Sequence, residues 1–410
     1  MMRRPVIVWI VLAALSMHLL TLASPAWVSV GVKSSNARDF ASFYYAARVA
    51  EEGGDPYDRQ ALNKASRSDG ARKGVHPFFY PPPFVAAMSW VTSLDLMTAY
   101  RVWFWFDALA LMAAALVLWR WWGRLDPMVG PLIAVSLAVL SAAPNNHIMG
   151  QMNAPALALA LTGLWQDDED RPWLGGICLG LACMWKMSPA LLVAWCLMRG
   201  RWRTVAGSCL TAVAVSVLSV PWVPWDVQQR FYLEVLPEFG NGNYNGLAVS
   251  IGLFGNHSIP NVWHQAYPGV DGGGLSEMAR WASTWTNGLM VVGLGLWFAR
   301  RGGDPMARAC QVGAVCVAML LIPVYTYEHH LLWALPAVIA AAVMLLRGRL
   351  GALWLLPLAL SFAIWAYPLS SLKEVWLASD TLWVRGLVQE AKFASLIVIG
   401  AACFWAGRDR

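Results

Sequence analysis

Long apolar runs alternate with short polar connections along most of this chain. Such runs are typical of membrane-spanning α-helices, which need about 20 predominantly apolar residues. The clear candidates are residues 5–28, 99–119, 128–143, 154–165, 204–220, 285–298, 309–324, 331–346, 350–366 and 386–406. Together with two ambiguous segments, the pattern predicts about twelve membrane segments.

The polar connections predict the orientation of these segments. Short clusters of arginine lie between or beside apolar runs, at residues 3–4, 199–203, 300–308, 347–349 and 408–410. Because positively charged loops stay on the cytoplasmic side, we expect these clusters and both termini inside. Two long connections, residues 32–77 and 221–283, then become the first and fourth outer loops. Interfacial helices are expected in the first of them.

Two arrangements are open for the part of the chain before residue 198. In the first, residues 84–91 cross the membrane and 173–198 form one further span. Alternatively, residues 84–91 lie at the outer surface, and 173–198 folds into two half-helices that meet near 186–189. The second arrangement keeps the basic residues 120–124 inside and places 145–153 outside, and we prefer it.

Composition narrows the class of protein. The chain has 410 residues, of which 58% are hydrophobic and only 13% are charged. A water-soluble chain of this size does not need so much apolar surface. The predicted fold class is therefore an all-α polytopic membrane protein, with residues 1–410 forming a single integral membrane domain. The net charge of +6 comes largely from the arginine clusters and is not a nucleic-acid signature.

The N-terminal segment and the cysteines also agree with a membrane protein. Residues 1–30 resemble a signal peptide, but Pro25 follows the only plausible cleavage site. We therefore interpret this segment as an uncleaved first helix. All seven cysteines lie in apolar runs, which indicates packing residues and neither disulfides nor metal ligands.

The most informative polar stretch, residues 37–57, follows the first apolar run directly. It begins with Arg38 and Asp39, continues as an aromatic-rich helix over 40–49 and ends in a Gly-Gly-Asp-Pro turn. An acid at the end of a membrane span could act on a group presented from the lipid. The alternative is an interfacial helix in which Asp39 serves only as the N-cap.

Two further polar sets lie within or between spans. The first, residues 145–153, is dense in Asn, His and Gln, and its alternative interpretation is a solvated turn. The second is Lys186 in otherwise apolar surroundings. A buried lysine is costly unless it pairs or snorkels to the interface, so Lys186 is either functional or a snorkelling residue.

The turn at residues 325–330 contains Glu328, His329 and His330 at the outer end of a span. Consecutive helical residues point in different directions, so this run supplies at most one or two zinc ligands. The histidines could instead bond a phosphate or a sugar hydroxyl. Asn256 and His257, in the second long loop, form a weaker candidate whose Asn-His-Ser pattern also fits a glycosylation sequon.

Seven short motifs follow one another along the chain: D-F-x-x-F-Y-Y-A-A (39–47), G-x-D-P-Y (53–57), Y-P-P (80–82), G-Q-x-N (150–153), K-x-x-P (186–189), G-N-x-S (255–258) and Y-E-H-H (327–330). In this order they resemble glycosyltransferase family 87, the polyprenol-phosphate-mannose-dependent α-mannosyltransferases of bacterial envelopes. Each motif is short, so the resemblance rests on their order. It covers the chain from residue 39 to about residue 330.

The resemblance implies a GT-C type glycosyltransferase fold in the bacterial inner membrane. It implies a sugar donor carried on a polyprenyl phosphate, an active site at the outer, periplasmic face, and no nucleotide, cofactor or metal. Asp39 matches the family's catalytic aspartate. The residues expected near the donor phosphate or sugar are Lys186, Glu328, His329, His330 and Tyr80. Further candidates for the pocket are Arg38, Tyr44, His147, Gln151, Asn153, Asn256 and His257.

One position departs from the family pattern. Where the family often has Gln, this chain has His257, and the difference bears on the acceptor side. The expected acceptor is an envelope lipid or glycan, and the transferred sugar is a hexose, with mannose preferred.

These residues predict a mechanism. A sugar hydroxyl is a poor nucleophile at neutral pH, so a carboxylate such as Asp39 should take its proton as it attacks the anomeric carbon. The phosphate leaves on the opposite face, which inverts that carbon, and cations or donors stabilise it. The aromatic residues 40–45 are expected to cover the sugar.

The alternative function is a transporter or flippase of lipid-linked sugars. Such a protein should contain internal repeats or paired broken helices, and the two halves of this sequence show no clear repeat. An envelope scaffold without activity gives no reason for Lys186 in an apolar run.

Overall fold

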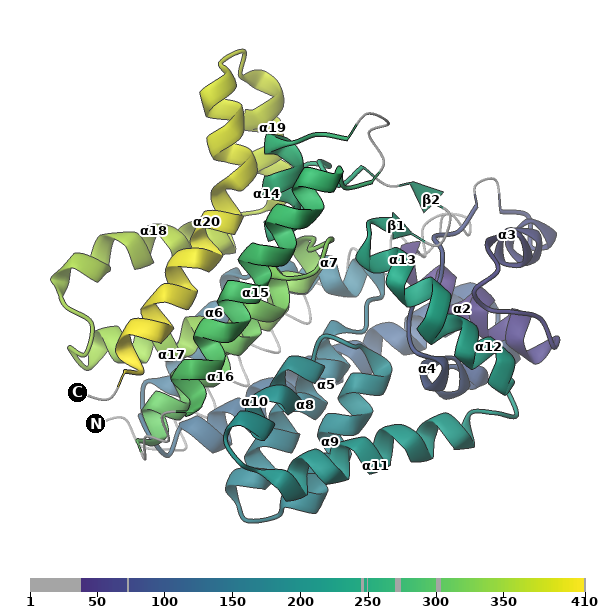
Figure 1. Ribbon diagram of the computed structural model, residues 1–410, viewed down its shortest axis with the longest axis horizontal. Helices are drawn as coiled ribbons and strands as arrows, with labels where there is room; N and C mark the ends of the chain where they lie inside the picture. Colours follow the sequence, from purple (N-terminus) through teal and green to yellow (C-terminus); the bar gives the residue numbers. More distant parts are fainter. Residues whose placement is uncertain are drawn as a thin grey trace.

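The computed structural model describes residues 38–71, 74–244, 247–248, 250–269, 274–299 and 304–408. This part of the chain is almost entirely helical (Figure 1). Its one strand pair is antiparallel, β1 (Asn243–Tyr244) with β2 (Leu247–Ala248), and Asn243 is opposite Ala248. The expected helical class is confirmed at this level, whereas the predicted first span, residues 5–28, lies outside the described residues.

The apolar runs from residue 99 onward form the long helices of the molecule. These helices are α5 (Leu96–Trp122), α6 (Val129–Val139), α8 (Asn153–Asp168), α9 (Pro172–Trp185), α10 (Ala190–Met198), α11 (Trp202–Leu218), α15 (Glu277–Ala299), α16 (Pro305–Leu321), α17 (Leu335–Leu346), α18 (Leu355–Ala366) and α20 (Leu382–Ala406). A 3₁₀ segment precedes α17 (η4, Glu328–Ala334), and another precedes α18 (η5, Ala352–Trp354).

Three continuous helical segments of the described chain are long and apolar enough to cross a membrane: Leu96–Trp122, Glu328–Leu346 and Leu382–Ala406. Two bent pairs raise the number to five. One joins α6 to α7 (Ala142–Met149) at 59°, and the other joins Ala352–Ala366 to α19 (Leu369–Ala378) at 96°. The chain is therefore a membrane protein with several spans, and the count of about twelve stays a prediction.

Close helix packing holds the first half together. Helices α8, α9 and α11 lie side by side in this order, with α5 against α8 (Figure 1). A Cβ at Gly163 would lie 2.8 Å from the carbonyl oxygen of Gly175, so only glycine allows α8 and α9 to approach this closely. In the second half, α20 packs against α16, α17, α18 and α19.

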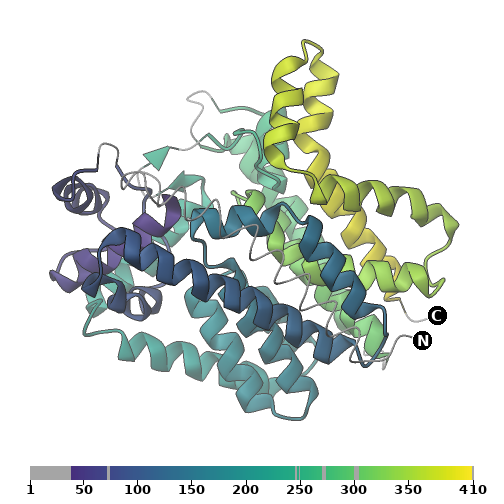
Figure 2. The same ribbon diagram turned by 180° about the vertical axis from the view of Figure 1, so that it is seen from behind.

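Short elements gather at the opposite end of the molecule from α18 and α20 (Figures 1 and 2). They are α2 (Arg38–Glu51), α3 (Arg59–Ser68), α4 (Pro82–Ala87), η2 (Ser89–Ser93), α12 (Trp225–Arg230), the π-helical turn Phe231–Val235 and α13 (Leu236–Gly240). The eight-residue helix α14 (Ile259–Ala266) packs against α15. The described parts of both predicted long loops thus contain several short helices.

Helix α2 bears on the interfacial-helix alternative, on the expected cover for the sugar and on Asp39 as an N-cap. The predicted helix over residues 40–49 is confirmed, but it does not lie on a surface, because Phe40, Phe43, Tyr44 and Tyr45 are all buried. The ring of Phe40 packs against Trp103 and that of Phe43 against Phe84, so these rings are not free to cover a sugar. Asp39 lies inside the first turn, since the helix begins at Arg38, so it is not the N-cap.

The polar segment 145–153 is not a solvated turn. Residues up to Met149 form α7, in which Asn146 and His147 are completely buried. Gly150 ends the helix in the left-handed conformation, with φ of 65°, and a Cβ there would lie 2.6 Å from Cβ of Phe40. Glycine is therefore required both for the turn and for the approach of α2.

The structure also bears on the two arrangements left open before residue 198. Helix α4 has only six residues, far fewer than the ~20 needed to span a bilayer. Residues 173–198 are broken into α9 and α10 at 186–189. Both observations favour the arrangement in which residues 84–91 lie at the surface and the later segment is divided.

Candidate active site

Asp39, Gln151 and Tyr80 form a connected polar group. Oδ2 of Asp39 accepts a hydrogen bond of 2.7 Å from Nε2 of Gln151, and Oε1 of the same amide accepts one of 2.6 Å from the Tyr80 hydroxyl. Gln151 reaches Asp39 because the left-handed Gly150 turns the chain back toward α2 at the end of α7. Asp39 is half-buried, and among the described residues its carboxylate accepts this one side-chain hydrogen bond. Oδ1 has no side-chain hydrogen-bond donor among the described residues.

Tyr80 lies in the segment just before α4, where Pro81 to Pro83 set an extended entry into the helix. Its environment keeps the phenol protonated: burial, and then the charge of Asp39, raise the pKa of Tyr80. A protonated phenol donates to Gln151, and Gln151 therefore presents its amide N–H group to Asp39.

Lys186 joins this group from the break between α9 and α10. Its Nζ lies 5.5 Å from the centre of the Tyr80 ring, and the charge of Asp39 acts on it. A cation over an aromatic face is attracted by about 0.5–2 kcal/mol, depending on how far it is desolvated. The side chain of Lys186 is half-buried and contacts this polar group, as its functional interpretation requires.

The 3₁₀ turn that begins at Glu328 supplies two histidines to the same region. The ring centres of His329 and His330 are 4.2 Å apart. The charges of Asp39 and Lys186 both interact electrostatically with the His329 ring. Nδ1 of His330 accepts a 3.0 Å hydrogen bond from the backbone N–H group of Tyr327, so Nε2 carries its proton while the ring is neutral. In the described part of the chain no three His, Cys, Asp or Glu side chains gather as metal ligands would.

Asp107 is a functional-site neighbour that sequence reasoning missed. It is fully buried in α5, accepts a 2.8 Å hydrogen bond from Nδ2 of Asn146, and pairs with Nδ1 of His147. Asn153 continues the network, since its Nδ2 donates to Oδ1 of Asn146 at 2.9 Å and to the carbonyl of His329 at 3.1 Å. An ionisable residue inside an apolar run is a signal of function, and it was present in the sequence.

This network explains where two predicted pocket residues lie. His147 and Asn153 are fully buried behind the site and hold α5, α7 and the His329 turn together. Their hydrogen bonds fix the start of α8 against the turn, which leaves them as supports of the site's geometry.

The carboxylate of Glu328 is also held by hydrogen bonds, in this case from Lys392 and Ser141. Its Oε1 accepts a 2.7 Å hydrogen bond from Nζ of Lys392 in α20, and the hydroxyl of Ser141 donates to the same oxygen. Both charged side chains are almost completely buried. Sequence reasoning also missed Lys392, which lies with Glu390 in a run that has the hydropathy of an ordinary span.

Asn256 and His257 connect the second long loop to the turn before η4. The Asn256 side chain bonds the carbonyls of Ile251 and Val324, each at 2.9 Å, and the N–H group of Thr326 at 2.9 Å. It is therefore a structural clamp. His257 is 1% exposed, and neither of its ring nitrogens has a partner among the described residues. Burial, and then the charge of Lys392, lower the pKa of His257 to about 3, so the ring is neutral.

One predicted pocket residue, Tyr44, is not brought to this region. The hydroxyl of Tyr44 donates to the carbonyl of Leu94 at 2.9 Å, and the side chain packs away from Asp39. The side chain of Arg38 lies outside the described residues.

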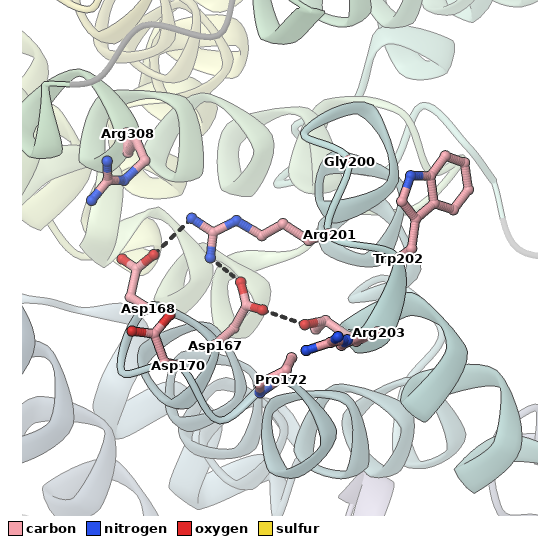
Figure 3. A pocket seen from close by; sticks show the side chains of 10 residues that line it. Asp167, Asp168, Asp170, Pro172, Gly200, Arg201, Trp202, Arg203 and Arg308 are labelled. Atoms are coloured by element: carbon pink, nitrogen blue, oxygen red, sulfur yellow. Dashed lines mark hydrogen bonds and ion pairs between the residues drawn. The ribbon is translucent and has the colours of Figure 1, made fainter.

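A cavity of about 520 Å³ lies elsewhere, between the α8–α9 and α10–α11 turns (Figure 3). Arg201 bridges two carboxylates there, pairing with Asp167 and with Asp168, the latter at 2.8 Å, while Thr204 donates to Asp167. Arg201 belongs to the cluster at residues 199–203, which the sequence predicts to be cytoplasmic. The opposite charges pair with one another, so the network ties two connecting turns together.

The sequence of this chain is similar to those of known proteins. A family model described as glycosyltransferase family 87 matches residues 78–323. A polyprenol-phosphate-mannose-dependent alpha-(1-2)-phosphatidylinositol mannoside mannosyltransferase of Mycolicibacterium smegmatis is 26% identical over 357 residues, which cover 79% of this chain and 76% of that protein. Its namesake in Mycobacterium tuberculosis is 25% identical over 77% of this chain and 78% of that protein. An alpha-(1->3)-arabinofuranosyltransferase of Corynebacterium glutamicum is 29% identical over a region that covers 46% of this chain and 47% of that protein.

Proposed function

The chain belongs to glycosyltransferase family 87, and on that premise we propose that it transfers mannose from a polyprenyl phosphate to an envelope glycolipid or glycan. That it is a membrane glycosyltransferase follows from the family and from the apolar helices.

Mannose is the preferred sugar because of which relatives match over most of the chain. The two mannosyltransferases cover 79% and 77% of it, whereas the arabinofuranosyltransferase covers 46%. The names of the mannosyltransferases state a polyprenol-phosphate-mannose donor and a phosphatidylinositol mannoside acceptor. We carry over the donor and the general class of acceptor, a glycolipid or glycan.

The observation that carries the proposal is the meeting of Asp39, Gln151, Tyr80 and Lys186 from four separate segments. A carboxylate with one oxygen engaged by an amide and the other open is oriented to receive a proton. In the proposed step, the acceptor oxygen attacks the anomeric carbon and its proton passes to Oδ1 of Asp39. The bond from that carbon to the phosphate oxygen breaks, with inversion, and releases polyprenyl phosphate.

The leaving phosphate is already ionised and needs positive charge or hydrogen-bond donors. Lys186 supplies the charge, and His329 and His330 supply N–H groups while remaining neutral. The electrostatic link between Lys186 and both Asp39 and His329 supports placing the reacting bond between the base and the lysine. Glu328 is assigned a sugar hydroxyl, since a carboxylate would repel the phosphate, and its Oε2 has no partner among the described residues.

The acceptor side is assigned to the second long loop. His257 is buried, neutral and without a partner for either ring nitrogen among the described residues, so it can donate one hydrogen bond and accept another. A hydroxyl of the acceptor sugar meets both requirements. We place this site at the outer face of the bacterial inner membrane, because the arginine-rich turns assign the opposite face to the cytoplasm.

Purified protein incubated with radiolabelled polyprenyl-phosphate-mannose and extracted envelope lipids tests the proposal. We expect label to move to a more polar lipid or glycan, with the anomeric configuration of the product opposite to that of the donor. Retention of configuration would refute the single-step mechanism. Movement of labelled donor across a vesicle membrane without transfer would favour a flippase.

A further inference from the structure

Lys392 is a buried cation in the last apolar helix, beyond the region matched by the family model. It is 0% exposed and lies near the middle of α20, which is apolar enough to cross a membrane. A charge in that position is costly and persists only where it is paired and hydrogen-bonded. Its partners should therefore reveal what it does.

All three donors of the Lys392 ammonium group have acceptors. Nζ donates to Oε1 of Glu328 at 2.7 Å, to Oγ of Ser141 at 3.1 Å and to the carbonyl of Trp365 at 3.3 Å. A lysine has three N–H groups and no acceptor, so this set is complete. The pair with Glu328 is neutral overall, and His257, which also feels Lys392, is neutral as well.

These acceptors come from places where helices break. Ser141 lies in the 59° bend between α6 and α7, and Trp365 lies in the last turn of α18, just before the 96° bend to α19. The final carbonyls of a helix lack intrahelical partners, and inside a membrane each unsatisfied group is expensive. The Lys392 ammonium group thus donates hydrogen bonds to polar groups at two helix bends, and it also donates one to the carboxylate of Glu328.

We propose that Lys392 is a positioning residue for the transfer reaction, acting through Glu328 on the His329–His330 turn. This inference rests on the proposed function, in which that turn contacts the donor phosphate and sugar. Glu328 begins the 3₁₀ turn, and one of its oxygens is held by Lys392 and Ser141. The carboxylate therefore fixes where the following two histidines begin, and leaves Oε2 as the oxygen that meets the substrate.

The test is a double-mutant cycle on kcat/KM for the polyprenyl-phosphate-mannose donor. The variants are Lys392→Met, Glu328→Gln and the double variant, each measured per folded molecule after size-exclusion chromatography. A displacement of the turn by about 1 Å should lower kcat/KM by about 10²-fold in Lys392→Met. Because Lys392 acts through Glu328, the double variant should lose no more than the worse single variant. It should also fold better than Lys392→Met, since no buried charge is left unpaired.

Ser395→Ala is the matched control. Ser395 is buried one turn away on the same helix, and its hydroxyl bonds the carbonyl of Lys392 without reaching the turn. Its kcat/KM should stay within about three-fold of the wild type, as expected for a change that leaves the site in place.

Several outcomes would overturn the inference. Losses that multiply in the double variant, or a normal kcat/KM in folded Lys392→Met, would mean that Lys392 does not act through Glu328. If Lys392→Met does not fold, a double variant that folds and transfers normally would lead to the same conclusion. Normal wild-type transfer with any of these results refutes this inference alone. Absence of transfer by the wild type refutes the proposed function, and this inference with it.

Discussion

Replacing Asp39 by Asn separates a catalytic carboxylate from a structural one. Asn has almost the same size, and its Oδ1 can still accept the 2.7 Å hydrogen bond from Gln151. What it loses is the ability to take a proton. If Asp39 is the base, turnover should fall by roughly 10²–10⁴-fold, which corresponds to about 3–5 kcal/mol in the activation barrier.

The cost to folding should be smaller than the cost to catalysis. A hydrogen bond to a charged group contributes about 1.5–3 kcal/mol and a neutral one about 0.5–1.5 kcal/mol, so the bond to Gln151 weakens by about 1 kcal/mol. The negative charge in the first turn of α2 adds about 0.3–1 kcal/mol through the helix dipole. The variant should therefore fold, insert and bind the lipid donor.

The assay is transfer from radiolabelled polyprenyl-phosphate-mannose, normalised to folded protein, beside a thermal unfolding curve and a donor-binding measurement. Asp58→Asn is the matched control, because Asp58 caps α3 by accepting from the N–H group of Gln60 and Asn can do the same. Its transfer should be normal. Near-normal transfer by Asp39→Asn would refute the assignment of Asp39 as the base.

Two further predictions follow from single contacts, and a third follows from the distribution of arginine along the chain. In an equilibrium measurement of donor binding, Lys186→Ala should weaken binding by about 1.5–3 kcal/mol, and Lys186→Arg should recover only part of that loss. Unchanged binding in the alanine variant would mean that Lys186 only snorkels to the interface. Gly150→Ala should lower unfolding stability by about 1–3 kcal/mol and reduce transfer, because its left-handed turn and the nearby Phe40 leave no room for a methyl group; an unchanged thermal midpoint would contradict this. With Cys209 changed to Ser, single cysteines at Arg67 and Asn241 should react with an impermeant thiol reagent added outside, whereas those at Arg203 and Gly348 should not; the reverse pattern would overturn the orientation.

The candidate site shows how far local patterns reach. Asp39, Tyr80, Gln151 and Lys186 are all recognisable as polar residues in short motifs, and the structure brings these four together. Asp39 and Gln151 are nevertheless 112 residues apart in sequence, and no pattern within either motif indicates that one bonds the other. Their roles stay a proposal, whereas their proximity is a property of the fold.

The solvated-turn alternative for residues 145–153 and the expected sugar cover, neither of which the structure supports, have one physical origin. Residues 145–153 have the composition of an exposed turn and residues 40–45 that of a cover for the sugar, because both are rich in groups that favour water or interfaces. In the structure, Asn146 and His147 are buried with Asp107 as partner, and the rings of Phe40 and Phe43 form a core. Burial depends on what packs against a segment, and polar groups accept burial when a partner is present.

By itself the sequence determined the membrane class and the positions of most helices, and it favoured the break at residues 186–189 that the structure contains. Hydropathy, helix periodicity and proline chemistry act over a few residues, so they can be read locally. Only the tertiary structure decided which charges are partners, such as Lys392 with Glu328 across 64 residues and Asp107 with His147 across 40. A lone charge in an apolar run indicates that a partner is needed, but the packing of distant helices selects it, because no local interaction favours one candidate over another.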